Sequence, residues 1–395
     1  MSDKVGEREH ALLSASGAHR WLICTPCARL EETFPEKSTK YTEEGRLAHA
    51  VAELELNAYW DQMPTYKHTE SLGFLESDPD YSAEMLRHAQ GYVDYIAQQA
   101  MSYDTRPAIK VEERVDYSAY APEGFGTADC LILASDVLHV IDYKYGKGKP
   151  VYAEQNPQLR LYALGAYEGW SWLYDIETVK YTIYQPRIDN LSEYEEPITT
   201  LLSWGDEVVK PAAKRAFAGE GDYVSGSHCG FCRAKALCRA RADFHLQLED
   251  YGYKEQPLLT DEEVGSILAK ARNLASWARA LEDYALKRCL DGHEIPGWKA
   301  VEGRKVRRFK DQDQAFDVLK MAGYDEAMLY RREPQTLAQI EKLIGKTRFN
   351  ELLTPYVAAD PGKPTLVTDT DKRNPVSHAD YAATTFADYI NEESV

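Results

Sequence analysis

The chain has 395 residues, of which 44% are hydrophobic and 28% are charged. These values are typical of a globular protein that buries a substantial core, and the length suggests two or three domains. The formal net charge of −18 argues against non-specific nucleic-acid binding by the whole surface, because affinity for phosphate comes from lysine and arginine. Any contact with nucleic acid must therefore be local.

Apolar segments and cysteines indicate the cellular compartment of the protein. No apolar run approaches the roughly 18 residues that span a bilayer, and residues 1–10 lack the apolar core of a signal peptide. We therefore expect a cytoplasmic protein with no membrane partner. The seven cysteines are an odd number in a long chain without a secretion signal, which argues against a disulfide framework.

The first part of the chain has helical periodicity. It predicts a short helix over Ser14–Glu32, a second from Thr42 to Trp60 with Thr42 as its N-cap, and a third over about 82–103. Alternating apolar residues then predict strands at 108–117, on both sides of residues 135–136, and at 177–185. Between them, Asn156-Pro157 is typical of a cap followed by proline at the first helical position, and it predicts a helix to about residue 167.

From Trp204 onward the pattern is helical again. It passes a cysteine cluster and continues in a long helix from about Asp261 to Leu290, after which Gly292 and Pro296 mark a break. A smaller α+β region follows, with helices near 313–321 and 337–344. We therefore expect an α/β (α+β) protein with a domain at 1–245, a helical connection at 246–292 and an accessory region at 293–395.

Two acidic residues are predicted to face each other across a hairpin. Ser135-Asp136 is typical of a two-residue turn, so Ala134 faces Val137 and, further along, Asp129 faces Asp142. Like charges at opposed positions are destabilising. A divalent cation bound between the two carboxylates would make their proximity favourable. Lys144 lies two residues past Asp142 and hence on the same face. Two carboxylates and a lysine on one surface predict a metal-dependent phosphodiesterase site.

Nearby residues extend this site. Mg²⁺ prefers oxygen ligands, and Mn²⁺ also tolerates an imidazole such as that of His49. Gln158 and Tyr162 stand four apart at the start of the next helix, on one face, where they could hold water or a phosphate. The plainer interpretation is an amphipathic helix packed on the sheet. A basic stretch is a candidate DNA contact or a solvated strand edge, and its cations are Arg304, Lys305, Arg307, Arg308 and Lys310.

Three cysteines within ten residues, Cys229, Cys232 and Cys238, predict a second metal site. The fourth ligand must come from elsewhere, and either Cys24 or Cys27 could supply it. Zn²⁺ and a 4Fe-4S cluster both accept four thiolates, and spacing alone does not decide between them. Two further cysteines without sequence partners, Cys130 and Cys289, are expected to be buried thiols.

Taken together, these motifs resemble the RecB-type branch of the PD-(D/E)XK nucleases, and in particular its iron–sulfur members, the CRISPR-associated RecB-like exonucleases and the AddB nuclease domain. The whole chain is also similar to a phage and prophage family catalogued as a domain of unknown function, through residues 14–24 and the late Asp371-Lys372-Arg373. The motifs that carry the nuclease resemblance are His49, Gly126-x-x-Asp129, Asp142-x-Lys144, Gln158-x-x-x-Tyr162 and the cysteine frame.

The resemblance implies a restriction-endonuclease-like core, in which a mixed central sheet is flanked by helices. It implies Mg²⁺ or Mn²⁺ on His49, Asp129 and Asp142 with the carbonyl of Tyr143 as a further ligand, and Lys144 as the catalytic lysine. Either Glu112 or Glu113 is a further candidate to approach the metal. The family pattern also implies a 4Fe-4S cluster that staples the nuclease domain, with Cys24 chosen over Cys27 as the ligand that joins Cys229, Cys232 and Cys238.

The expected function is that of a metal-dependent DNA exonuclease in phage recombination, repair or end processing in a bacterial host cell. Its expected partners are DNA and a phage single-strand annealing protein. An alternative from a different class is a non-catalytic, metal-stapled DNA-binding or scaffold protein, which would retain DNA without cleaving it.

Overall fold

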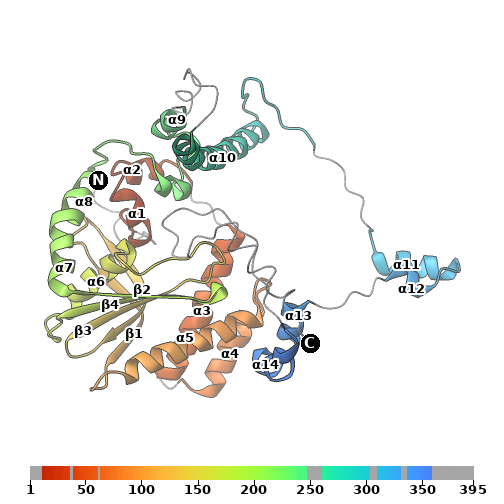
Figure 1. The fold of residues 1–395 in the computed structure, drawn as a ribbon, viewed down its shortest axis with the longest axis horizontal. Helices are drawn as coiled ribbons and strands as arrows, with labels where there is room; N and C mark the ends of the chain where they lie inside the picture. The colour runs from red at the N-terminus through yellow and green to blue at the C-terminus, as the bar shows by residue number, and fades with distance from the viewer. Residues whose placement is uncertain are drawn as a thin grey trace, which may run out of the picture. The chain divides into compact units, whose positions relative to one another are not determined.

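The computed structural model describes residues 11–35, 39–60, 63–246, 260–302, 309–330 and 336–357. The chain forms two compact units, divided between Val301 and Glu302. The first unit contains one five-stranded mixed sheet flanked by helices (Figure 1). The expected mixed α+β architecture is therefore confirmed.

The strands lie in the sheet in chain order, β1-β2-β3-β4-β5. The first three form an antiparallel meander, β4 runs parallel to β3, and β5 runs antiparallel to β4. A parallel neighbour requires a crossover connection, and helix α6 (Pro157–Trp170) provides it. The strand bounds are β1 (Ala108–Asp116), β2 (Phe125–Leu133), β3 (Val137–Tyr143), β4 (Thr178–Gln185) and β5 (Asn190–Pro197).

The hairpin between β2 and β3 has the predicted turn and register. The backbone N–H of Ala134 donates to the carbonyl of Val137 at 2.9 Å, which closes a two-residue turn. Paired residues then run from Leu133 opposite Leu138 to Cys130 opposite Ile141. The ladder ends at that pair, so the next residues along the two strands are Asp129 and Asp142.

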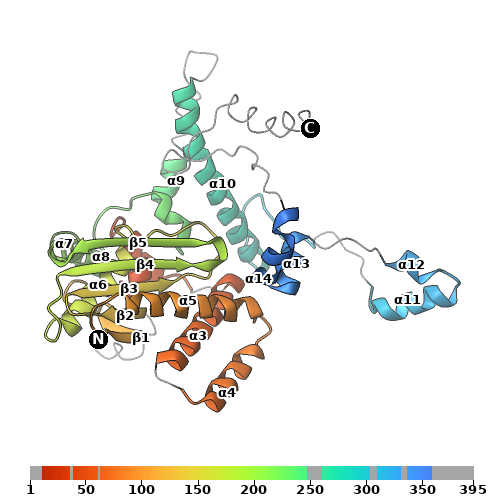
Figure 2. The same ribbon diagram turned by 60° about the horizontal axis from the view of Figure 1, so that its bottom comes forward.

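Helices α3 (Lys40–Trp60) and α5 (Ala83–Met101) cover one face of the sheet (Figures 1 and 2), and α4 (Thr65–Glu76) packs on α3. The prediction of Thr42 as an N-cap is wrong. The helix begins two residues earlier, and the hydroxyl of Thr39 accepts the N–H of Thr42 at 3.2 Å. The predicted single helix over Ser14–Glu32 is also interrupted, because Pro26 cannot continue a helix. The segment forms two short helices instead, α1 (Ala18–Trp21) and α2 (Cys27–Glu32).

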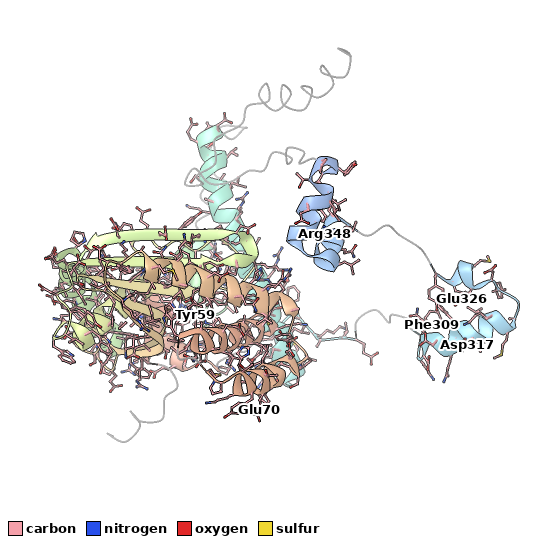
Figure 3. All side chains as sticks on the ribbon, turned by 90° about the horizontal axis from the view of Figure 1, so that it is seen from below. Tyr59, Glu70, Phe309, Asp317, Glu326 and Arg348 are labelled. Carbon is pink, nitrogen blue, oxygen red and sulfur yellow. The ribbon has the colours of Figure 1, made fainter. Side chains whose placement is uncertain are left out.

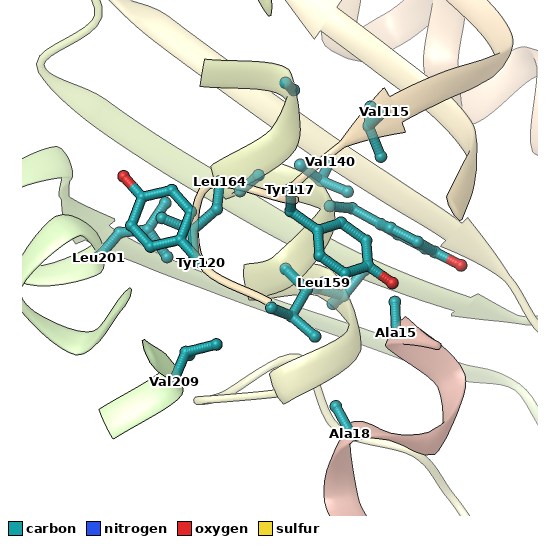
Figure 4. Packing of buried hydrophobic residues seen from close by; sticks show 14 of the residues in the cluster. Ala15, Ala18, Val115, Tyr117, Tyr120, Val140, Leu159, Leu164, Leu201 and Val209 are labelled. Carbon is teal, nitrogen blue, oxygen red and sulfur yellow. The ribbon is translucent and has the colours of Figure 1, made fainter. Parts of the chain in front are cut away.

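The other face of the sheet is covered by α6, α7 (Ile198–Trp204) and α8 (Lys210–Ala218), with a π-helical turn over residues 205–209 between the last two. Figure 4 shows Leu159 and Leu164 of α6 in the core beside Tyr117 and Tyr120. The side chain of Asn156 accepts the N–H groups of residues 158 and 159, and proline follows it. This is the predicted cap, although the helix continues beyond the predicted end to Trp170.

A helical part follows the sheet. It contains α9 (Arg239–Leu246) and α10 (Asp261–Leu290), and the latter has the predicted bounds and a capping box between Thr260 and Glu263. The ring of Trp277 on α10 stacks on His245 with 5.1 Å between ring centroids. No helix among the described residues is long and apolar enough to cross a membrane.

The second unit is helical where the structure describes it. Its helices are α11 (Gln312–Met321), α12 (Glu326–Leu329), α13 (Leu337–Ile344) and α14 (Lys346–Leu353). Phe316 contacts both Phe309, labelled in Figure 3, and Tyr330. Residues 309–330 and 336–357 contain no strand, so the strand part of the expected α+β region is not found there. The basic residues Arg304, Lys305, Arg307 and Arg308 lie outside the described residues, as does 371–373.

A buried ion pair anchors α6 to strand β5. The guanidinium of Arg160 donates to both carboxylate oxygens of Glu196, at 2.9 and 2.8 Å, and the hydroxyl of Tyr181 donates to the same carboxylate at 2.8 Å. Both charged residues are buried. The pair therefore holds the helix that carries Gln158 and Tyr162.

We predict that Glu196→Ala lowers the free energy of unfolding by about 3–5 kcal/mol, because it leaves a buried guanidinium without its carboxylate. Asp206→Ala is the control, since it removes an exposed pair with Lys210 and should cost less than about 1 kcal/mol. Urea denaturation measures both. Equal small losses would show that the buried pair does not anchor the helix.

Candidate metal and catalytic site

A kink in strands β1 and β2 creates the site. Val111 pairs with Cys130 and Glu113 pairs with Ala128, so Glu112 lies opposite Asp129. The backbone of Glu112 has a φ of +47°, a left-handed conformation that strains a residue other than glycine. Together with the register of β2 and β3, this places three acidic residues, Glu112, Asp129 and Asp142, in one row across three strands.

The facing of the side chains changes at the same row. In β2, Cys130 packs with the α3 and α5 side of the sheet and Leu131 with the α6 side, yet Ala128 also packs on the α6 side. In β1, Val111 packs on the first side and Val115 on the second. Strict alternation would put odd-numbered residues of one strand on one face. In both strands the alternation of side chains between the two faces is therefore interrupted at the row of carboxylates, while the pairing register stays the same.

The imidazole of His49 completes a group of possible metal ligands. Its Nδ1 lies 3.4 Å from Oδ1 of Asp129, and ligand atoms of His49, Glu112 and Asp129 all lie within 4.8 Å of one another. The other oxygen of Asp129, Oδ2, accepts the backbone N–H of Tyr143 at 2.7 Å. One imidazole and two carboxylates form a donor set that suits Mn²⁺ or Mg²⁺.

A second group of side chains adjoins the first. The ammonium of Lys144 lies 3.0 Å from Oδ1 and 2.8 Å from Oδ2 of Asp142, and it donates to Oε1 of Gln158 at 3.3 Å. The amide of Gln158 donates to Asp142 at 3.0 Å and to the hydroxyl of Tyr162 at 3.3 Å. The side chain of Asp142 is 3% exposed, so these donors take the place of solvent around its carboxylate.

Gly126 makes room for this arrangement. A Cβ at this position would lie 2.7 Å from the ring of Tyr162, which is closer than carbon atoms pack. The glycine of the Gly126-x-x-Asp129 motif therefore lets α6 approach β2 at the site.

The site carries more negative than positive charge. Burial, and then the charge of Asp129, raise the pKa of Glu112 to about 7. Burial also raises the pKa of Asp142, against the opposing effect of Lys144. For Asp129, burial acts in the same direction, but His49, Lys144 and the N–H of Tyr143 outweigh it and hold its pKa below the ordinary value. Without a further cation, part of this charge must be neutralised by protons.

The structure brings most of the predicted site residues together. His49 and Asp129 form one group, and Asp142, Lys144, Gln158 and Tyr162 form the other; the N–H of Tyr143, next to Asp142, joins them through Asp129. The ring of Tyr143 lies against His49, with 5.5 Å between the ring centroids, and its backbone N–H, rather than the predicted carbonyl, contacts Asp129. Of the two candidate glutamates, Glu112 is the one that joins the group, and the change of facing explains why simple alternation could not identify it.

The predicted thiol site contains one more cysteine than expected. Cys24, Cys27, Cys229, Cys232 and Cys238 line one pocket together with His228. Hydrogen bonding from Cys27 is the main influence that lowers the pKa of Cys24 to about 5, while Cys229 and Cys24 raise the pKa of His228 to about 10. The geometry alone does not choose Cys24 over Cys27. Of the two lone cysteines, Cys130 is buried as predicted and Cys289 is half-buried.

Polar contacts join the two segments that carry these cysteines. The carboxylate of Glu31 accepts the N–H of Arg233 at 2.8 Å and the guanidinium of Arg20 at 3.3 Å. The hydroxyl of Thr25 donates to the carbonyl of Glu220 at 2.6 Å. Residues about 200 apart in the chain are thus held together beside the thiols.

Comparison with known proteins gives a family but no activity. One solved structure, described as the crystal structure of SSO0001, is 13% identical in sequence and matches 56% of this chain and 96% of its own, with a TM-score of 0.21. So low a score gives no support to any conclusion about fold or function. The model of a family described as protein of unknown function (DUF2800) matches residues 10–374. The chain therefore belongs to the DUF2800 family.

Proposed function

We propose that the protein is a metal-dependent nuclease that hydrolyses phosphodiester bonds in DNA. The observation that carries the proposal is the convergence of His49, Glu112 and Asp129 beside a lysine that is bound to Asp142. Ion pairs that serve only the fold rarely combine three carboxylates, an imidazole and a lysine at one strained row of a sheet.

Each group has a chemical task in this proposal. A divalent cation held by His49, Glu112 and Asp129, with Asp142 beside them, would supply Lewis acidity toward a phosphate and toward water. Lys144 would place a positive charge next to the phosphoryl oxygens as negative charge develops on them. Gln158 fixes the position of Lys144, because it accepts from the ammonium and donates to the carboxylate that the ammonium contacts.

The order of strands supports the more specific proposal of a PD-(D/E)XK nuclease of the RecB-like type. An antiparallel meander is followed by a helix and a parallel strand, and the acidic residues lie where the ladder between β2 and β3 ends. We propose an exonuclease in phage recombination, repair or end processing, working beside a single-strand annealing protein. A scaffold that only retains DNA would not need Lys144 to be held against Asp142.

For the thiols we propose a 4Fe-4S cluster as a structural staple. The pocket offers three thiols from the segment after α8 and two from the N-terminal segment, which is enough for the four thiolates that such a cluster requires. The contacts of Glu31 and Thr25 at the same place support a role in joining distant segments.

The first test is cleavage. Purified protein with Mn²⁺ should degrade linear duplex DNA, and Asp142→Asn or Lys144→Gln should each lower the rate by at least about 100-fold. Asp136→Asn is the matched control, because this exposed carboxylate lies in the turn of the same hairpin and should leave the rate unchanged. No degradation by the wild-type protein, or equal rates for all variants, would reject the proposal.

The second test measures metal binding without DNA. A cation that relieves the repulsion between carboxylates stabilises the folded state by mass action, so saturating Mn²⁺ should raise the Tm of the wild-type protein by about 5 °C or more. Asp129→Asn and Glu112→Gln should abolish most of this increase, whereas Asp136→Asn should keep it. A wild-type Tm that does not respond to Mn²⁺ would contradict the assignment of these ligands.

The third test concerns the thiols. Protein purified without oxygen should be brown and contain iron and acid-labile sulfide in equal amounts, and Cys232→Ala or Cys238→Ala should lose both. Cys289→Ala, a cysteine outside the pocket, should keep them. A colourless preparation with stoichiometric zinc would overturn the cluster.

A further inference from the structure

The loop between β3 and α6 begins and ends in the candidate site. Lys144 precedes it and Gln158 follows it, and their side chains contact each other at 3.3 Å. Residues 145–157 are therefore a closed loop whose base is the catalytic group itself. Whatever this loop binds lies beside the scissile phosphate of the proposed reaction.

Polar contacts from β4 and β5 hold the loop in one conformation. The buried side chain of Gln185 donates to the carbonyls of Gly146 and Lys149, at 3.0 and 3.4 Å, and accepts the N–H of Val151 at 3.2 Å. Asn190 donates to the carbonyl of Val151 at 2.8 Å. The backbone of the loop is thus ordered by the fold, and Tyr145 and Ala153 pack in the core while residues 146–150 are exposed.

Between Gly146 and Pro150 the side chains that this backbone presents to solvent are cationic, while Glu154, nearer to α6, is an exposed carboxylate. Lys147 and Lys149 are exposed, and neither forms an ion pair with another residue in the described ranges. Packing within the chain does not require the glycine between them, because a Cβ at Gly148 would meet no atom within 4 Å. A backbone without side chains at such a place suits the close approach of a ligand.

We propose that Lys147 and Lys149 bind the phosphodiester backbone of the DNA strand next to the scissile phosphate. This inference rests on the proposed nuclease function and adds its strand-binding element. Lys147 is three residues from Lys144, so their Cα atoms lie within about 11 Å of each other. At about 3.4 Å of rise per nucleotide along a strand, this is the range of a phosphate a few nucleotides away. Gln185 is a positioning residue for the loop.

The experiment compares Lys147→Gln/Lys149→Gln with Lys67→Gln/Lys214→Gln. The control changes charge equally, at exposed lysines of α4 and α8, which carry none of the site residues. Binding of end-labelled duplex DNA is measured by fluorescence anisotropy in Ca²⁺ over a range of KCl concentrations. Cleavage of the same DNA is measured separately in Mn²⁺, and a single-stranded RNA of equal length is included as a competitor.

The loop variant should bind DNA on the order of tenfold more weakly, because two phosphates are no longer neutralised by lysine. Its plot of log K against log salt should be less steep by about 1.8, which is about 0.9 for each of these phosphates. Its cleavage rate at DNA concentrations below saturation should fall by a similar factor, because less DNA is bound. The control should match wild type in all three measurements.

The outcomes separate this inference from the proposed function. If wild type cleaves DNA and the loop variant binds with unchanged affinity and salt dependence, the inference is overturned while the nuclease stands. If the loop variant loses affinity but wild type does not cleave, the nuclease fails and the strand-binding loop stands. Failure of wild type to bind DNA, or RNA binding that is tighter than DNA binding and equally sensitive to the lysines, would overturn the assignment to a DNA strand.

Discussion

The constraint on which this structure depends is the repulsion within its row of carboxylates. Glu112, Asp129 and Asp142 occupy neighbouring strands at the same level of the sheet, where like charges at opposed positions are destabilising. The charges that oppose them are the ammonium of Lys144 and the imidazole of His49. A cation of charge two would resolve this imbalance with the ligands already present, and this is the basis of the proposed metal site.

Several parts of the fold serve to maintain this row. The left-handed backbone at Glu112 costs on the order of 1–3 kcal/mol of conformational free energy. Packing of the surrounding sheet and helices must offset this cost. The buried pair of Arg160 with Glu196 fixes α6, whose first turn brings Gln158 to Lys144. The thiol pocket and Glu31 bring the N-terminal helices to the segment after α8. The same few polar contacts therefore stabilise the fold and position the side chains of the candidate site.

Local patterns in the sequence predicted the parts of the fold and site that depend on neighbouring residues. The turn at 135–136 determined the register of β2 and β3, and the asparagine and proline at 156–157 located the start of α6. Strand β5 was missed because its glutamates and Asn190 are unusual in a strand, although charge is common on the edge of a sheet. The role of Glu112 depends on a reversal of φ, and the proximity of Cys27 depends on how Pro26 bends the chain; neither can be deduced from periodicity.

The most direct test of the central claim is a crystal structure of the protein with Mn²⁺, with anomalous diffraction recorded at the manganese absorption edge. An anomalous peak is expected in contact with His49, Glu112 and Asp129, on the side of the sheet where Lys144 meets Asp142. A peak elsewhere, or carboxylates that turn away from one another with no metal between them, would contradict that claim.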